Sequence, residues 1–239
     1  MARRVLVTRP EPGASATAAR LIERGFEPVI LPLTEIVPLR PAELPDGIDA
    51  IVATSANAFR HAPAAFMEKL RDLPLHVVGA RTAKAAGRDV ALVAPDARAL
   101  SQALAGRLAA RSHVVHLTGR VRRPELKLAL QAQGHRVTEI ELYDARAVEL
   151  APDETGTKLG PEPLWVALVY SQRGGEILDR IAAEAQSSFQ TTVFVCISAE
   201  AAAGLKDRQI AVAAMPDEAG MLAKLAELDQ SAARPHLGN

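Results

Sequence analysis

Short apolar runs alternate with amphipathic stretches along the whole chain. Residues 5–7 and 50–53 are apolar at every position, and each run is followed by a polar loop and by apolar residues at helical spacing. Such runs are typical of parallel strands that are covered by helices on both faces. Strands that alternate with helices predict right-handed βαβ units. The pattern also predicts one helix over residues 58–70 and a polar loop over residues 151–163.

The order of these elements occurs twice. Thr8 corresponds to Thr118, 110 residues later, and Ser55 corresponds to Ser171, 116 residues later. Self-similarity of this kind indicates a duplicated unit rather than one continuous sheet. The recurring stretches are 5–36, which returns as 114–142, and 49–62, which returns as 166–179.

Two extended passages divide the duplicated chain into domains. They cover residues 34–39, which lead into a Pro-rich stretch, and residues 140–148. Two crossings between domains imply that one domain is discontinuous. We expect residues 1–36 plus 147–239 to form a discontinuous α/β domain and residues 37–146 to form an inserted α/β domain.

The composition narrows the class of protein. The 239 residues are 49% apolar, which is enough for two α/β domains, and Lys plus Arg equals Asp plus Glu at 28 each. This balance gives no general attraction to nucleic acid or to anionic membranes. The single cysteine, Cys196, excludes an internal disulfide, and no apolar stretch approaches the roughly 18 residues of a membrane span. We expect a soluble cytoplasmic protein whose last residues, 231–239, fray.

The loops that follow the strands carry hydroxyl, amide and guanidinium groups. In doubly wound sheets, ligands bind beyond the carboxyl ends of the strands, where free N–H groups at helix starts face the opening. Donors of these kinds suit a ligand with many carboxylates. Each Ser or Thr could instead only cap its helix, but six such loops favour a shared site. The candidate residues are Arg9, Ser55, Asn57, Gly79, Thr82, Thr118, Gly119, Arg120, Ser171 and Ser198.

Other catalytic signatures are absent from the sequence. There is no GxGxxG after a strand, no GxxxxGK[ST], and no metal-ligand spacing among the 6 His. We therefore expect no cofactor and no metal. His113 and His116 fit ordinary strand residues better than ligands, and Cys196 fits a buried strand residue better than a nucleophile.

Two further features point to chemistry. Arg120, Arg122 and Arg123 directly follow a strand-end loop, which favours anion binding over a solvated face. Tyr143 lies in the second crossing passage and is one of only 2 tyrosines. A tyrosine in a linker usually packs, but one that faces a cleft between domains could donate a proton to a departing group.

Several short motifs follow one another along the chain. They are VLVTRP (5–10), ATSANA (53–58), VGARTA (78–83), LTGRVRRPEL (117–126), GHRV (134–137), LY (142–143) and SQRG (171–174). In this order and spacing they resemble the motifs of the uroporphyrinogen-III synthase family. One departure is visible, because many members carry GPTTA where this chain has Ser-Ala-Glu-Ala-Ala at residues 198–202. The late threonine hydroxyl is therefore missing, and backbone amides of that turn would serve instead.

The resemblance implies two α/β domains joined by a two-stranded β-ladder, and it implies a reaction. The linear tetrapyrrole hydroxymethylbilane loses water and closes with inversion of ring D, through a spiro intermediate, to uroporphyrinogen III. This step serves haem, sirohaem, cobalamin and chlorophyll biosynthesis and needs no cofactor. The substrate carries eight carboxylates, which suits the donor-rich loops. The implied roles are an acid for the leaving hydroxyl at Tyr143, substrate donors at Ser55, Thr82 and Ser171, and carboxylate partners at Arg9 and Arg120.

The main alternative is a two-lobed sensor that binds an anion or a tetrapyrrole without turnover. Such a sensor would usually carry an output segment, for which the sequence offers no candidate. A nucleotide-dependent enzyme is disfavoured by the missing phosphate loops. We expect a monomer, since no heptad or apolar stripe favours assembly, and transient contact with the preceding or following enzyme of the pathway.

Overall fold

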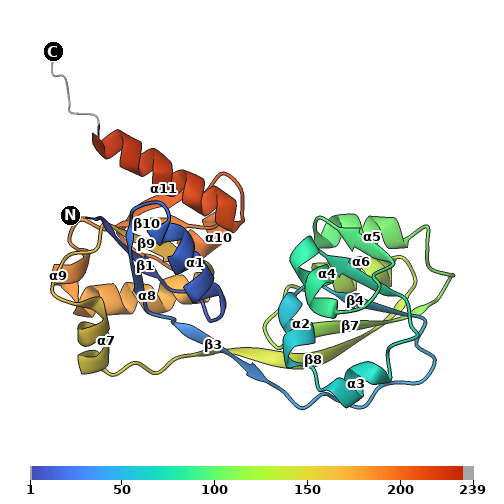
Figure 1. The fold of residues 1–239 in the computed structure, drawn as a ribbon. Coiled ribbons are helices and arrows are strands. Elements are labelled where there is room, and N and C mark those ends of the chain that lie inside the picture. The colour runs from blue at the N-terminus through green and yellow to red at the C-terminus, as the bar shows by residue number, and fades with distance from the viewer. Residues whose placement is uncertain (1, 234–239) are drawn as a thin grey trace. The chain divides into compact units, whose positions relative to one another are not determined.

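The computed structural model describes residues 2–233, and the chain forms two compact units (Figure 1). Unit 1 comprises Met1–Glu35 and Ala147–Asn239, and unit 2 comprises Ile36–Arg146. Each unit contains one β-sheet whose strands pair mainly in parallel. The predicted α/β class with parallel sheets is confirmed.

In unit 1 the strand order is β11-β10-β9-β1-β2, and all these neighbours pair in parallel. The strands are β1 (Arg4–Val7), β2 (Glu27–Ile30), β9 (Val166–Val169), β10 (Val193–Cys196) and β11 (Gln209–Val212). The helices are α1 (Gly13–Ile22), α7 (Pro152–Leu159), α8 (Gln172–Glu184), α9 (Gln186–Phe189), α10 (Ala199–Ala202) and α11 (Glu218–Ala233).

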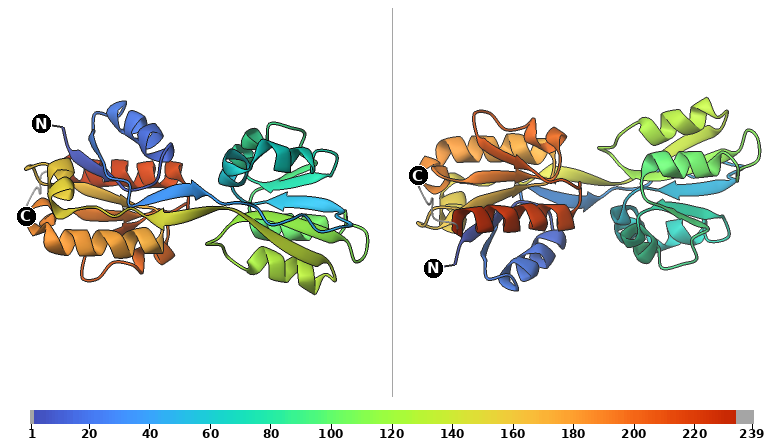
Figure 2. Two further views of the ribbon diagram at one scale, coloured as in Figure 1. Left: turned by 90° about the horizontal axis from the view of Figure 1, so that it is seen from below. Right: turned by 90° about the horizontal axis from the view of Figure 1, so that it is seen from above.

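Both faces of the sheet in unit 1 are covered. Successive side chains of a strand point to opposite faces, so Leu6 and Val5 of β1 belong to two different core clusters. Leu178 of α8 packs in the cluster of Leu6, whereas Leu21 of α1 and Leu225 of α11 pack in the cluster of Val5. Figure 2 shows the same arrangement, with α1 and α11 on one face and α8 on the other. Unit 1 is therefore a three-layer α/β unit.

In unit 2 the strand order is β3-β8-β7-β4-β5-β6. Strands β8 to β6 pair in parallel. The strands are β3 (Thr34–Pro38), β4 (Ala50–Ala53), β5 (Leu75–Val78), β6 (Leu92–Ala94), β7 (His113–Gly119) and β8 (Arg136–Ala147). The helices are α2 (Ala56–His61), α3 (Ala64–Glu68), α4 (Ala80–Ala86), α5 (Ala97–Leu104) and α6 (Glu125–Ala132).

Unit 2 also has helices on both faces of its sheet. Ile51 and Val52, neighbours in β4, belong to two core clusters. Phe66 of α3 packs with Ile51, and Leu100 of α5 and Leu130 of α6 pack with Val52. The same three-layer construction therefore occurs in both units.

Strands β3 and β8 are the segments at which the chain passes between the units. The Leu39 N–H donates to the Leu142 carbonyl at 2.9 Å, and the Val148 N–H donates to the Leu33 carbonyl at 3.0 Å. Because residue numbers rise in one strand as they fall in the other, the two strands are antiparallel.

Two local expectations were wrong. The helix expected over residues 58–70 is divided into α2 and α3, because Ala62 (ψ 135°) and Pro63 (ψ 137°) are extended. A residue before proline is pushed out of the helical region, so the first helix ends there. The loop expected over residues 151–163 contains α7, which has a proline in its first turn and Asp153 and Glu154 beside its N-terminus.

Two further expectations concern the ends of the chain and membranes. Of the tail expected to fray, residues 231–233 belong to α11, and residues 234–239 lie outside the described residues. Among residues 2–233, no helix is long and apolar enough to span a membrane.

Candidate functional site

The predicted binding residues lie at the carboxyl ends of strands in both units, whereas Tyr143 lies within β8. Since neighbouring strands are parallel, these ends share one edge of each sheet. In unit 2 this edge carries Ser55 and Asn57 after β4, Gly79 and Thr82 after β5, and Thr118, Gly119 and Arg120 at the end of β7. In unit 1 it carries Arg9 after β1, Ser171 after β9 and Ser198 after β10.

A pocket of about 420 Å³ opens at this edge of unit 2. Of the predicted site residues, Thr118 and Tyr143 line it, as do Arg122 and Arg123 of the arginine cluster, whereas Ser55, Asn57, Gly79, Thr82, Gly119 and Arg120 do not. Its volume falls in the range of small-molecule sites. The rest of the lining comes from four places: Thr54 after β4, His116 in β7, Asp96, Ala97 and Arg98 at the start of α5, and Val121, Arg122, Arg123, Glu125 and Leu126 in the loop after β7 and the first turn of α6.

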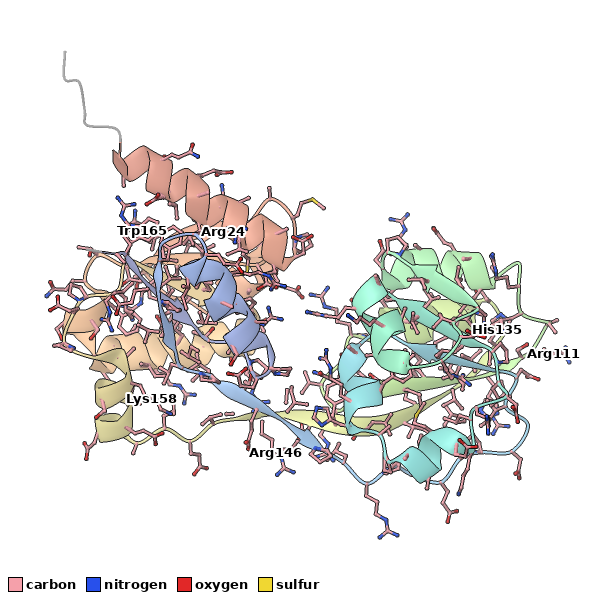
Figure 3. All side chains as sticks on the ribbon, in the orientation of Figure 1. Arg24, Arg111, His135, Arg146, Lys158 and Trp165 are labelled. Atoms are coloured by element: carbon pink, nitrogen blue, oxygen red, sulfur yellow. The ribbon has the colours of Figure 1, made fainter. Side chains whose placement is uncertain are left out.

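A larger hollow, of about 570 Å³, lies in unit 1. It is lined by residues of α11, by Arg20 of α1 and by Arg24, which is labelled in Figure 3. None of the predicted site residues lines it. Size alone therefore does not identify the site, and the pocket of unit 2 is the better candidate because it holds hydroxyl groups at strand ends.

Tyr143 reaches this pocket from β8. Its ring is half-buried, and the His61 ring of α2 lies 6.3 Å away between ring centres. Among the described residues, no hydrogen bond uses the Tyr143 hydroxyl. A phenol in such a place can donate its proton to a bound molecule.

A buried carboxylate, Glu139, organises the charged groups beneath the pocket. It accepts hydrogen bonds from Arg122 at 2.9 and 3.2 Å and from Lys127 at 3.0 Å. Burial raises the pKa of Glu139, but the bonds from Arg122 and Lys127 outweigh burial and bring the pKa below its usual value. Glu139 is therefore ionised and neutralised by two cations.

His116 lines the pocket beside Glu139. Its side chain is 3% exposed, its Nδ1 lies 3.7 Å from a Glu139 oxygen, and neither ring nitrogen has a hydrogen-bond partner among the described residues. Burial lowers the pKa of His116 to about 4, although Glu139 acts in the opposite direction. At neutral pH the imidazole is uncharged, so it adds a polar but neutral group to the pocket wall.

The arginines of this edge are already paired with carboxylates. Arg122 donates to Glu141 at 2.8 Å as well as to Glu139. Arg120 donates to Glu141 at 3.2 Å and to Asp144 at 3.4 Å, but its side chain is 53% exposed. Exposed pairs of this kind contribute little to stability and exchange easily. Arg120 can therefore take a new anion, whereas Arg122 is held in place.

Arg9 of unit 1 is held more firmly. Its guanidinium lies 3.6 Å from Glu218 and 4.8 Å from the centre of the Tyr170 ring, and it donates to Thr17 at 3.4 Å. Glu218 also accepts from Arg20 at 2.6 Å. The predicted carboxylate partner in unit 1 thus has both an ionic and an aromatic contact.

The predicted serines cap helices. Ser55 accepts from the Asn57 N–H at 3.2 Å, Ser171 from the Gly174 N–H at 3.1 Å, and Ser198 from the Ala201 N–H at 3.3 Å. A hydroxyl that accepts a hydrogen bond still has its own hydrogen to donate. Capping and ligand binding are therefore compatible at these positions.

Thr82 and Gly79 differ from the serines. Thr82 is 5% exposed, and Gly79 begins α4 with φ +79°, a left-handed conformation that favours glycine. Gly79 thus has a backbone role at the turn.

The sequence matches the model of the family "Uroporphyrinogen-III synthase HemD" over residues 15–225. The chain belongs to the uroporphyrinogen-III synthase family. This membership favours a lyase of porphyrin biosynthesis over a sensor module. No curated protein matches the sequence.

Solved structures of family members share the fold. The uroporphyrinogen-III synthetase of Helicobacter pylori is 16% identical with a TM-score of 0.66, over 95% of this chain and 100% of that one. A mutant uroporphyrinogen III synthase of Thermus thermophilus is 18% identical with a TM-score of 0.51, over 96% of this chain and 100% of that one.

Several residues of this enzyme's pocket were not predicted as site residues. Thr54 and His116 line the pocket, and Glu139 fixes Arg122 beneath it. Thr54 directly follows the apolar run of β4, so its place at a strand end could have been found in the sequence. His116 and Glu139 come together only because β7 and β8 are neighbours, and no local pattern shows that pairing.

Two titratable groups outside the pocket, His113 and Cys196, have the structural surroundings that the sequence predicted. His113 bonds the Asp46 carbonyl at 3.2 Å and the Thr138 hydroxyl at 2.8 Å, as a structural residue does. Cys196 is buried, and burial raises the pKa of its thiol to about 12, which leaves it protonated. Among residues 2–233 no group of three or more His, Cys, Asp or Glu could hold a metal ion.

Proposed function

We propose that the enzyme dehydrates and cyclises hydroxymethylbilane to uroporphyrinogen III at the pocket of unit 2, with Tyr143 as the proton donor. The observation that carries this proposal is the Tyr143 hydroxyl, which reaches the pocket and has no hydrogen bond within the described part of the chain. The two compact units act as the two domains of the enzyme.

The first step is the loss of water. The Tyr143 hydroxyl donates its proton to the hydroxyl oxygen of the substrate, the carbon–oxygen bond breaks, and water leaves. The pyrrole nitrogen supplies the electron pair, which gives an azafulvene cation and a Tyr143 phenolate. General acid help of this kind typically accelerates a reaction by roughly 10²–10⁴-fold.

The later steps depend on conformation. The azafulvene carbon bonds to a carbon of ring D, the spiro intermediate rearranges, and the proton lost from carbon at the end restores the phenol of Tyr143. Because the bilane also closes spontaneously to the isomer without inversion, the protein must chiefly hold the reacting carbons together. Thr54 and Thr118 supply hydroxyl groups for this purpose.

The carboxylates of the substrate need cationic and amide partners. Arg120 exchanges Glu141 and Asp144 for a substrate carboxylate, because both contacts are long and the Arg120 side chain is 53% exposed. Free N–H groups at the starts of α2, α5 and α6 supply further donors. Arg9, Ser171 and Ser198 are the proposed donors from unit 1.

The experiment mixes freshly generated hydroxymethylbilane with EDTA-treated protein and separates the uroporphyrin isomers after oxidation. We expect isomer III to predominate, and a sample without protein should give isomer I. Formation of isomer I alone, at the rate of the sample without protein, would contradict the proposal and favour the sensor.

We further propose that the enzyme is a cytoplasmic monomer. Size-exclusion chromatography with light scattering should give the chain mass of 25.4 kDa at all concentrations. A mass twice as large would contradict the monomer.

A further inference from the structure

We infer that Gly119 is a positioning residue. Because glycine has no side chain, the Tyr143 ring can occupy the space where a side chain of residue 119 would lie. This inference rests on the proposed role of Tyr143. A Cβ atom built on Gly119 would lie 2.6 Å from Cε2, 2.7 Å from Cζ and 3.1 Å from the hydroxyl oxygen of Tyr143. Real Cβ atoms essentially never approach below 3.0 Å. Any residue other than glycine must therefore move the end of the ring that carries the hydroxyl.

The pairing of β7 with β8 creates this contact. The register runs from His113 opposite Arg136 to Thr118 opposite Glu141, and then shifts so that Gly119 lies opposite Tyr143. One extra residue on β8 is a β-bulge, a device that re-aims a side chain and is frequent beside active sites. The bulge brings Tyr143 to the end of β7 at the mouth of the pocket.

The backbone does not itself demand glycine at this position. Gly119 is not among the glycines with positive φ, which include Gly79 and Gly134. Alanine can therefore adopt the same backbone conformation. The atoms that it would displace belong to the far end of a flexible side chain, so the ring can turn away without disturbing the sheet.

A different role for Gly119 makes a different prediction. The sequence suggested that Gly119 binds the substrate, which a glycine does through its backbone groups. Gly119→Ala keeps those groups but fills the space of the ring. The substitution therefore distinguishes between two roles of Gly119, the positioning of the Tyr143 ring and a backbone contact with the substrate.

The test is a double-mutant cycle with Gly119→Ala and Tyr143→Phe, assayed by formation of isomer III. We expect Gly119→Ala to lower kcat by about ten-fold, since misplacing a catalytic group by about 1 Å has effects of that order or more. In the Tyr143→Phe background, Gly119→Ala should cause no further loss. Gly106→Ala is the matched control, because a Cβ there meets nothing within 4 Å, and it should change kcat less than two-fold.

A second measurement does not depend on activity. The chain has 2 tyrosines, Tyr143 and Tyr170, so 3-fluorotyrosine labelling should give two fluorine resonances in NMR, which Tyr170→Phe assigns. Gly119→Ala should shift the Tyr143 resonance and leave that of Tyr170 in place, which also shows that the variant is folded. Gly106→Ala should leave both resonances in place.

The outcomes separate this inference from the proposed function. The inference is overturned if Tyr143→Phe lowers kcat but Gly119→Ala does not. It is also overturned if the fold-losses in kcat of the two single variants multiply in the double variant, because Gly119 then does not act through Tyr143. An unshifted Tyr143 resonance in Gly119→Ala also overturns it. If Tyr143→Phe turns over normally, the proposed role of Tyr143 fails, whatever the resonances show.

Discussion

The two tyrosines of the chain lie one in each compact unit, and their surroundings differ. In unit 1 the Tyr170 hydroxyl is buried and has no hydrogen-bond partner among the described residues, and the Arg9 guanidinium lies over its ring. Burial raises the pKa of Tyr170, against the opposite effect of Thr17 and Arg9. In unit 2 Tyr143 lines a pocket, with its ring against Gly119. Of the two tyrosines, only Tyr143 is thus a candidate acid, because a substrate can reach it.

The carboxylates of the two edges show a similar contrast. Glu218 in unit 1 pairs with Arg9 and Arg20, and its side chain is 21% exposed. Glu139 in unit 2 pairs with Arg122 and Lys127 and is 9% exposed. Both networks hold an arginine in place, but only that of unit 2 does so beneath a pocket that carries hydroxyl groups.

The largest expected change in stability follows from the buried carboxylate. Glu139→Gln should lower the free energy of unfolding by about 2–3 kcal/mol, because it removes the charge that two cations share at a site that is only 9% exposed. Arg122 keeps its bond to Glu141, and the partial exposure of Arg122 and Lys127 reduces the cost further. Glu218→Gln should cost about half as much. Urea unfolding followed by circular dichroism measures both.

The control for this pair is Glu68→Gln. Glu68 and Arg71 form an exposed pair, at 67% and 66%, whose loss should cost at most about 0.5 kcal/mol. If Glu139→Gln and Glu68→Gln lower the free energy of unfolding equally, the ion pairs of Glu139 contribute no more to stability than an exposed pair does.

The next largest expected effect is a pH dependence of the free energy of unfolding, which arises from His116 in unit 2. The folded pKa of His116, about 4, is below its unfolded value of 6.5. As the pH falls from 7 to 5, His116 becomes protonated in the unfolded chain but not in the folded chain. The free energy of unfolding should therefore fall by about 2 kcal/mol because of His116. Below pH 4 the folded chain binds it too, and the loss stops growing. The groups that face His116 are Glu139, Arg122 and Lys127.

The matched variant for this pH dependence is His116→Gln, which cannot titrate. Burial also lowers the pKa values of His61 and His76, so both proteins should lose some stability toward pH 5. The wild type should lose about 2 kcal/mol more than the variant. Parallel curves of urea midpoint against pH would contradict a buried neutral His116.

The smallest expected effect compares the corresponding serines of the two halves. Ser55→Ala and Ser171→Ala should each lower stability by about 1 kcal/mol, because each hydroxyl caps a helix. Glycine is nearly as good a cap as serine, so Ser55→Gly and Ser171→Gly should cost only a few tenths of a kcal/mol.

The same variants separate capping from substrate binding. If the hydroxyl also donates to a substrate carboxylate, both the alanine and the glycine variants should raise KM by about five-fold, which corresponds to one such hydrogen bond. We expect this result. An unchanged KM in the glycine variants would limit the serines to capping.

Much of the fold follows from local patterns in the sequence. The apolar runs of β1 and β4 predicted parallel strands, because such runs are buried on both faces. The break at Pro63 and the helix α7 were missed, since both depend on backbone preferences at single prolines that the apolar pattern does not reveal.

The candidate site was less accessible to sequence analysis. Thr118 and Tyr143 were predicted and do line the pocket. Thr118 could be recognised because it ends an apolar run, and Tyr143 because it lies in the second crossing passage. The contact of Gly119 with Tyr143 depends on a bulge between distant strands, and the pairing of Arg122 with Glu139 depends on the same strand pair. Such pairings arise from tertiary structure and leave no periodic signal.

The most direct test of the account compares Tyr143→Phe with Tyr170→Phe in the hydroxymethylbilane assay. Each variant removes one phenolic hydroxyl, from unit 2 in Tyr143→Phe and from unit 1 in Tyr170→Phe. The account predicts that Tyr143→Phe forms isomer III about ten- to a hundred-fold more slowly, at or below the lower end of the rate enhancement that a general acid provides, and that Tyr170→Phe stays within two-fold of the wild type. Normal turnover by Tyr143→Phe, or an equal loss in both variants, would contradict it.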